Sequence, residues 1–128
     1  MAHILVIDDQ AFVRDVIQRL LGSVGHQVLL ARDGEEGLRL LREQPADLVL
    51  CDLLLPGMGG LDIIQELKGG WPHVPVVALS GGSFDGEWDV LPAAEALGAA
   101  ATLSKPFTVE ALLALVERLL RAPERHPS

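Results

Sequence analysis

The alternation of two kinds of segment along the chain constrains its fold more than any other feature. Short apolar runs at residues 4–7, 27–31, 48–51, 74–79 and 101–104 are separated by segments whose apolar residues recur at helical spacing. The central runs, such as 4–7 and 48–51, are apolar throughout, which is typical of parallel strands with helices on both faces. We therefore predict a three-layer α/β/α domain on a five-stranded parallel sheet, with right-handed crossovers.

Local signals place the helices between these runs. The spacing predicts helices over residues 12–24, 34–44, 61–70 and 110–120, and a weaker one over 88–97. Asp33 and Thr108 are typical caps of a helix N-terminus. Gly25 and Pro45 are typical of the residues that follow a helix, and they come directly after the first and second predicted helices. The second predicted helix is therefore marked at both ends, by Asp33 and by Pro45.

Polar residues stand where four of the apolar runs end. Asp8 and Asp9 follow the first run, Asp52 follows the third, Ser80 follows the fourth and Lys105 follows the fifth. Ligand sites of open α/β sheets form beyond the carboxyl ends of the strands. Residues spread over about a hundred positions of the sequence are therefore expected to converge on one pocket.

This set of side chains is suited to a divalent cation and a phosphoryl group. Carboxylates are the hard oxygen ligands that Mg²⁺ prefers, and three of them crowded together without a cation would raise the pKa of at least one. One carboxylate could act as a nucleophile toward phosphorus and form an acyl phosphate. Lys105 would then pair with the phosphoryl oxygens, and Ser80 would donate a hydrogen bond to them.

Length and charge limit the other possibilities. A chain of 128 residues fits one domain, which we expect over residues 1–122, with 123–128 as a frayed tail. No apolar stretch approaches the ~20 residues that span a bilayer, so no membrane contact is expected. A formal charge of −8 argues against nucleic-acid binding. The single cysteine, Cys51, is expected in the core and suits a reducing cytoplasm.

Four stretches of sequence together resemble the receiver domain of two-component response regulators, and we expect a regulator of the single-domain type. The resemblance runs from His3 to about Leu120, and its motifs are specific in combination rather than singly. They are Ile7-Asp8-Asp9, Asp52-Leu53-Leu54-Leu55-Pro56-Gly57-Met58-Gly59-Gly60, Ala78-Leu79-Ser80-Gly81 and Lys105-Pro106-Phe107.

The resemblance implies a role for each site residue. Asp52 would be the phosphoacceptor, Ser80 the switch hydroxyl and Lys105 the phosphate-binding cation. The implied Mg²⁺ ligands are Asp8, Asp9, Asp52 and the backbone carbonyl of Leu54.

The resemblance also implies a flavodoxin-like strand order, 2-1-3-4-5, and partners for the chain. A histidine kinase or a histidine phosphotransfer protein would supply the phosphoryl group, and phosphorylation would alter binding to a downstream protein or relay the phosphate. The chain would catalyse only its own phosphorylation and dephosphorylation.

The sequence also departs from the family pattern. Three positions before the phosphate-binding lysine, the family usually has an aromatic residue, whereas this chain has Thr102 and no tyrosine at all. The glycine-rich segment 81–88 is expected to be either a mobile lid or a long solvated loop. The resemblance further implies that the residues two after Asp52 and two after Ser80, here Leu54 and Gly82, flank the path of the hydrolytic water. Neither side chain can orient that water, so we expect a long-lived phosphorylated state.

Other functions remain open on the sequence. An Asp-nucleophile phosphatase would carry Asp-x-Asp on its first strand, whereas Asp8 and Asp9 are adjacent. A flavin-binding domain would need more aromatic residues than two Trp and three Phe. The chain is also compatible with a receiver cut from a longer regulator. Arg14 lies near the expected site, where a contact with a phosphodonor protein and a solvated side chain are equally compatible with the sequence.

Overall fold

The computed structural model describes residues 2–53, 59–80 and 94–121. Its strands are β1 (His3–Ile7), β2 (Gln27–Ala31), β3 (Leu48–Asp52), β4 (Val76–Ser80) and β5 (Ala101–Ser104). Its helices are α1 (Ala11–Ser23), α2 (Gly34–Glu43), α3 (Gly60–Gly70) and α5 (Val109–Arg121). The weaker predicted helix is helical at residues 94–96, while its residues 88–93 lie outside the described part of the chain.

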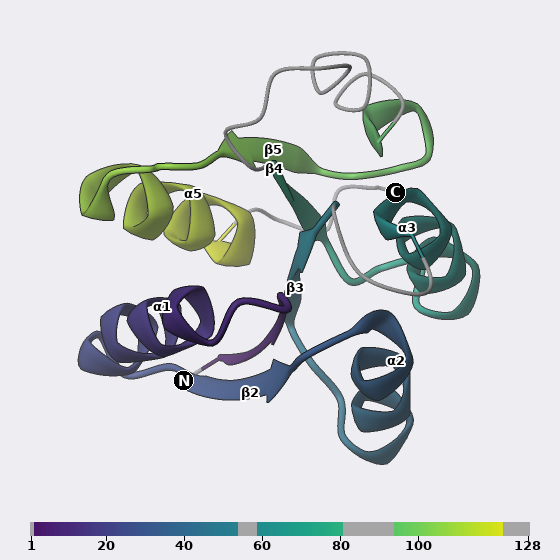
Figure 1. The fold of residues 1–128 in the computed structure, drawn as a ribbon, viewed down its shortest axis with the longest axis horizontal. Coiled ribbons are helices and arrows are strands. Elements are labelled where there is room, and N and C mark those ends of the chain that lie inside the picture. Colours follow the sequence, from purple (N-terminus) through teal and green to yellow (C-terminus); the bar gives the residue numbers. More distant parts are fainter. Residues whose placement is uncertain (1, 54–58, 81–93, 122–128) are drawn as a thin grey trace.

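The five strands form one parallel sheet in the order β2-β1-β3-β4-β5. Helices α1 and α5 lie on one face of this sheet, and α2 and α3 lie on the other (Figure 1). The predicted three-layer architecture and strand order are therefore confirmed. No helix in the described residues is long and apolar enough to cross a membrane.

Side chains of each central strand alternate between two hydrophobic clusters, one on each face of the sheet. In β1, Ile4 and Val6 pack with Ile17 of α1 and Leu112 of α5, while Leu5 joins the cluster on the α2 and α3 side. All five side chains are fully buried. Both faces of these strands are covered, which accounts for their apolar sequence between the polar residues at their ends.

The sequence signals at the helix ends are borne out. The Asp33 carboxylate accepts a hydrogen bond from the Glu36 N–H at 2.9 Å, and the Thr108 hydroxyl accepts one from the Ala111 N–H at 3.0 Å. Gly25, just beyond α1, has a φ of 98°, a conformation that favours glycine. The side-chain caps at Asp33 and Thr108 fix where α2 and α5 begin, close to the carboxyl ends of β2 and β5.

Helix α2 packs closely against β1 through Gly37. A Cβ atom at this position would lie 2.5 Å from Cδ1 and 2.8 Å from Cγ1 of Ile7, so the contact needs a residue without a side chain. Ile7 is the last residue of β1 and directly precedes Asp8. The packing of α2 therefore supports the strand end that carries the first acidic residues.

Candidate functional site

The carboxyl ends of four strands bring the polar residues together. Asp8 follows β1, Asp52 ends β3, Ser80 ends β4 and Lys105 follows β5. Asp8, Asp52 and Ser80 are 0%, 3% and 2% exposed, and no other polar residue in the described part of the chain is as buried. Asp9 is exposed. The structure thus gathers the residues that the sequence predicted to converge.

Backbone hydrogen bonds continue past the strand ends and hold this edge of the sheet. The Asp8 N–H donates to the Ala31 carbonyl at 3.0 Å, and the Lys105 N–H donates to the Ser80 carbonyl at 2.7 Å. The side chains that follow β1 and β5 therefore start from fixed backbone positions.

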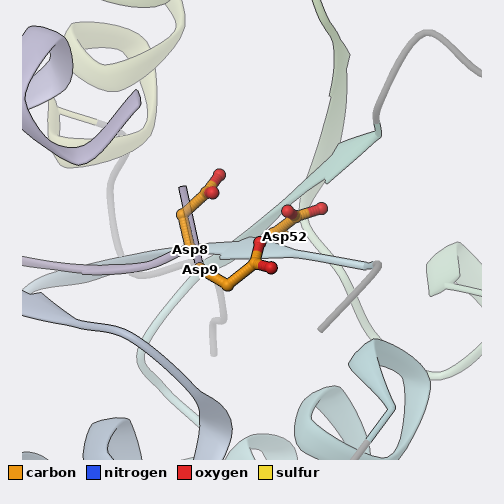
Figure 2. A group of neighbouring side chains, drawn as sticks. All are labelled: Asp8, Asp9 and Asp52. Atoms are coloured by element: carbon orange, nitrogen blue, oxygen red, sulfur yellow. The ribbon is translucent and has the colours of Figure 1, made fainter. Parts of the chain in front are cut away.

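The three carboxylates fit a Mg²⁺ ion. One oxygen from each of Asp8, Asp9 and Asp52 lies within 4.8 Å of the others, beyond the ends of β1 and β3 (Figure 2). Carboxylate oxygens are the hard ligands that Mg²⁺ prefers, and three of them within this distance could serve one ion. The fourth expected ligand, the carbonyl of Leu54, lies outside the described residues.

Lys105 pairs with two of these carboxylates. Its Nζ donates to Oδ2 of Asp8 at 2.8 Å, to Oδ2 of Asp52 at 3.3 Å and to Oε1 of Gln10 at 3.4 Å. Burial lowers the pKa of Lys105, but the hydrogen bond to Asp8 and the charges of both carboxylates outweigh it, so the pKa is raised. The single ammonium and the three clustered carboxylates together formally leave two negative charges, the complement of a divalent cation.

Cys51 adjoins the site without taking part in it. Its side chain is fully buried, and its Sγ donates a hydrogen bond to the Asp52 carbonyl at 3.4 Å. Burial raises the pKa of the Cys51 thiol well above its ordinary value, and the negative charges of Asp52 and Asp8 raise it further. The thiol therefore stays protonated and serves as a core residue, as the sequence indicated.

The first turn of α1 holds Asp8 at two points. The backbone N–H of Gln10 donates to Oδ1 of Asp8 at 2.9 Å, and Nη1 of Arg14 donates to the Asp8 carbonyl at 2.7 Å. Sequence reasoning did not single out Gln10. The available signal was its position directly after the acidic pair at a helix N-terminus, where glutamine caps poorly; its side chain makes no capping hydrogen bond.

Of the two main departures from the family pattern, the structure describes Thr102 but not the glycine-rich segment. Thr102 is half-buried in β5, where it pairs with Ala78 of β4. The glycine-rich segment 81–88, including Gly82, lies outside the described residues, as does Leu54. Their expected effects on water access therefore stay predictions.

Residues 4–117 match the sequence model of the family described as response regulator receiver domain. The chain is 40% identical over 115 residues to the sensory/regulatory protein RpfC of Xanthomonas campestris pv. campestris, which covers 87% of this chain and 15% of that protein. It is 38% identical over 118 residues to the two-component response regulator PhoP of Pseudomonas aeruginosa, covering 92% of this chain and 51% of PhoP. It thus spans about half or less of these relatives.

Solved structures show the same likeness. The receiver domain of NtrX from Brucella abortus is similar to this chain with a TM-score of 0.87 and 32% identity, over 93% of this chain and 98% of that one. A response regulator receiver domain protein from Clostridium thermocellum gives a TM-score of 0.86 with 35% identity, over 94% of each chain.

Proposed function

Because the chain belongs to the response regulator receiver domain family, we propose that it is a Mg²⁺-dependent phosphoacceptor that carries the phosphoryl group on Asp52. The observation that supports this most is the placement of a nearly fully buried Asp52 carboxylate beside Asp8, Asp9 and the ammonium of Lys105. We assign the domain to residues 1–122, with 123–128, which lie outside the described residues, as a tail.

In the proposed reaction, a carboxylate oxygen of Asp52 attacks the phosphorus of the donor. A new P–O bond forms while the bond from phosphorus to the leaving group breaks, and the leaving group keeps the bonding electron pair. Acetyl phosphate would release acetate in this way, and phosphohistidine would release the imidazole side chain of the donor histidine. The product is an acyl phosphate on Asp52.

The other residues neutralise charge and position the group. Lys105 would move its hydrogen bond from Oδ2 of Asp52 to a phosphoryl oxygen, and the Ser80 hydroxyl would donate to another. Mg²⁺ bound to Asp8, Asp9, Asp52 and the Leu54 carbonyl would offset the remaining negative charge. The chain then acts only on itself, through slow hydrolysis of its own acyl phosphate.

The proposed donor is a histidine kinase or a histidine phosphotransfer protein. The output is a changed affinity for a downstream protein, or transfer of the phosphate onward. A single-domain regulator and the receiver of a longer one would use the same site. We place this exchange in the cytoplasm, which the buried free thiol of Cys51 suits.

Incubation with Mg²⁺ and acetyl phosphate, followed by intact mass measurement, tests the proposal. The wild type should gain one phosphoryl group, and Asp52→Asn should gain none, because the amide lacks the anionic oxygen that attacks phosphorus. Asp47→Asn is the matched control: Asp47 immediately precedes the same strand, at its opposite end, and its side chain is 57% exposed. It should be labelled like the wild type.

Two results would contradict the proposal. Unchanged labelling of the folded Asp52→Asn protein, mapped to another residue, would show that the acceptor lies elsewhere. Release of inorganic phosphate from the donor without any intermediate on the chain in rapid-quench samples would favour the phosphatase alternative.

A further inference from the structure

The charges at the site show what an anionic phosphodonor must overcome. Asp8, Asp9 and Asp52 carry three negative charges, Lys105 carries one positive charge, and a bound Mg²⁺ would bring the sum to zero. The whole chain has a formal charge of −8. A donor phosphoryl group is itself negative, so its recruitment calls for a further positive charge near the acids.

Lys105 has no donor left for this task. An ammonium has three N–H donors, and Nζ of Lys105 has three acceptors within hydrogen-bond distance, on Asp8, Asp52 and Gln10. It can turn to the phosphoryl group only as transfer proceeds and Asp52 releases it. Another cation must therefore make the first contact with an incoming phosphodonor.

Arg14 meets this requirement. Its guanidinium donates from Nη1 to the carbonyl of Asp8, a neutral acceptor, and no carboxylate in the described part of the chain lies within 4 Å of it. Four further arginines pair with nearby carboxylates on or beside the same helix: Arg19, Arg32, Arg39 and Arg121. The charge of Arg14 is thus held beside the acidic site and is not neutralised there.

Building on the proposed function, we propose that Arg14 forms the phosphodonor subsite of this receiver, where its guanidinium binds the donor's phosphoryl oxygens before transfer to Asp52. The hydrogen bond to Asp8 uses one of five N–H donors and fixes the side chain in advance, which suits it to a phosphate. Because this contact forms in the ground state, its loss should weaken donor binding rather than slow the bound reaction.

Initial rates of phosphorylation over a range of acetyl phosphate concentrations, at saturating Mg²⁺, test the subsite. Arg14→Gln should raise the half-saturating acetyl phosphate concentration about fivefold, the upper end of the range for one solvent-exposed ion pair. The maximal rate should not change. Arg14→Lys keeps the charge and should recover part of the loss. Added salt should slow the wild type more than Arg14→Gln, because it screens the attraction.

The matched control is Arg118→Gln. Arg118 lies in the last turn of α5 and, like Arg14, has no carboxylate partner within 4 Å among the described residues, so the substitution changes the net charge equally. It should leave donor binding as in the wild type. If the half-saturating acetyl phosphate concentration rose equally in Arg14→Gln and Arg118→Gln, the cause would be a general charge effect, and the proposal would be overturned.

Binding can also be read without transfer. In the Asp52→Asn protein, inorganic phosphate added with Mg²⁺ should shift the side-chain NMR signal of ¹⁵N-labelled Arg14, while that of Arg118 stays in place. An unshifted Arg14 signal at saturating phosphate would refute the subsite. Reduced Mg²⁺ affinity in Arg14→Gln and in Arg14→Lys would assign the side chain a structural role at Asp8 instead, and would also refute it.

A second phosphodonor tests whether Arg14 contacts the phosphoryl group or the molecule that carries it. Transfer from a phosphorylated histidine phosphotransfer protein should weaken in Arg14→Gln by a factor similar to that for acetyl phosphate. A loss confined to the protein donor would make Arg14 a protein contact and would contradict the subsite. Absence of labelling in the wild type would refute the proposed function itself, whereas labelling indifferent to Arg14 would refute only this inference.

Discussion

At the scale of single residues, Lys105 is the counterion of a buried acidic pair. Its ammonium contacts Asp8 and Asp52, and its side chain is 13% exposed. Replacing it by methionine would leave two buried carboxylates without their cation. Such a loss typically costs about 3–5 kcal/mol, and the partial exposure here places the expected loss for Lys105→Met at about 2–4 kcal/mol without Mg²⁺. Urea unfolding with a chelator present measures it.

At the proposed metal site Mg²⁺ would bind the same two carboxylates in the folded state, so it should recover much of this stability. Lys68→Met is the matched control, since Nζ of Lys68 donates to the carbonyls of Pro72 and Val74 rather than to carboxylates. Its unfolding midpoint should respond to Mg²⁺ as the wild type does. A Lys105→Met protein as stable as the wild type in chelator would contradict the assignment.

Asp9 would contribute to the proposed metal site from its exposed side. It supplies one of the three clustered oxygens, and no ion pair of the described residues includes it. Asp9→Ala should weaken Mg²⁺ binding and slow phosphorylation at low Mg²⁺, while stabilising the metal-free fold by relieving repulsion among the acids. Mg²⁺ titrations of the phosphorylation rate measure this, with exposed Asp62→Ala of α3 as control. A wild-type rate at low Mg²⁺ would rule out this metal site.

The site residues differ in how far the sequence could place them. Asp8, Asp52 and Lys105 were predictable because each ends an apolar run, and parallel strands end at one edge of the sheet. The contacts of Gln10 and Arg14 were not, because they depend on how α1 turns back over Asp8. Spacing along a helix indicates which residues share a face, but it does not indicate where the helix starts relative to the preceding strand.

At the scale of elements, the contact between α2 and β1 is set by Gly37. Gly37→Ala would gain up to about 1 kcal/mol of helix propensity. Its Cβ would, however, lie 2.5 Å from Ile7, and overpacking of this kind costs about 1–3 kcal/mol. We expect net destabilisation and a weaker Mg²⁺ site, because Ile7 leads into Asp8. Chemical unfolding and Mg²⁺ titration measure the two effects.

Gly22→Ala in α1 is the matched control for Gly37→Ala. A Cβ at Gly22 would meet no atom within 4 Å, so only the gain in helix propensity applies. This variant should be more stable than the wild type by up to about 1 kcal/mol. Equal stabilisation of both variants would show that α2 can move away from Ile7 at little cost, and that the close packing does not support the site.

The helices themselves were predictable to within a residue or two at most ends, because caps and stop signals act locally. The predicted first helix, 12–24, is Ala11–Ser23 in the structure, and the predicted fifth, 110–120, is Val109–Arg121. The close approach at Gly37 was not predicted. A glycine inside a helix signals weak propensity, and its packing partner on β1 becomes visible only once the two elements are placed.

At the scale of the whole molecule, the alternating pattern was enough to predict the layers and the parallel sheet. The strand order came from the family resemblance, because the pattern alone does not say which strands are neighbours. One consequence concerns Thr102, which is half-buried on the edge strand β5. With threonine where the family usually has a large aromatic residue, a ring at this position cannot report phosphorylation.

The lifetime of the phosphorylated state depends on which groups the fold leaves around the acyl phosphate. The family resemblance implies that the residues two after Asp52 and two after Ser80, here Leu54 and Gly82, flank the path of the hydrolytic water; both lie outside the described residues. Neither side chain can hydrogen-bond the water that must attack phosphorus in line. We therefore predict slow hydrolysis for a receiver, suited to a sustained signal.

Loss of the phosphorylated mass over time in Mg²⁺ measures this hydrolysis. A double variant, Leu54→Asn with Gly82→Glu, should decay faster because it supplies polar groups at both positions. Decay within seconds that the double variant leaves unchanged or lengthens would show that water reaches the site without their help.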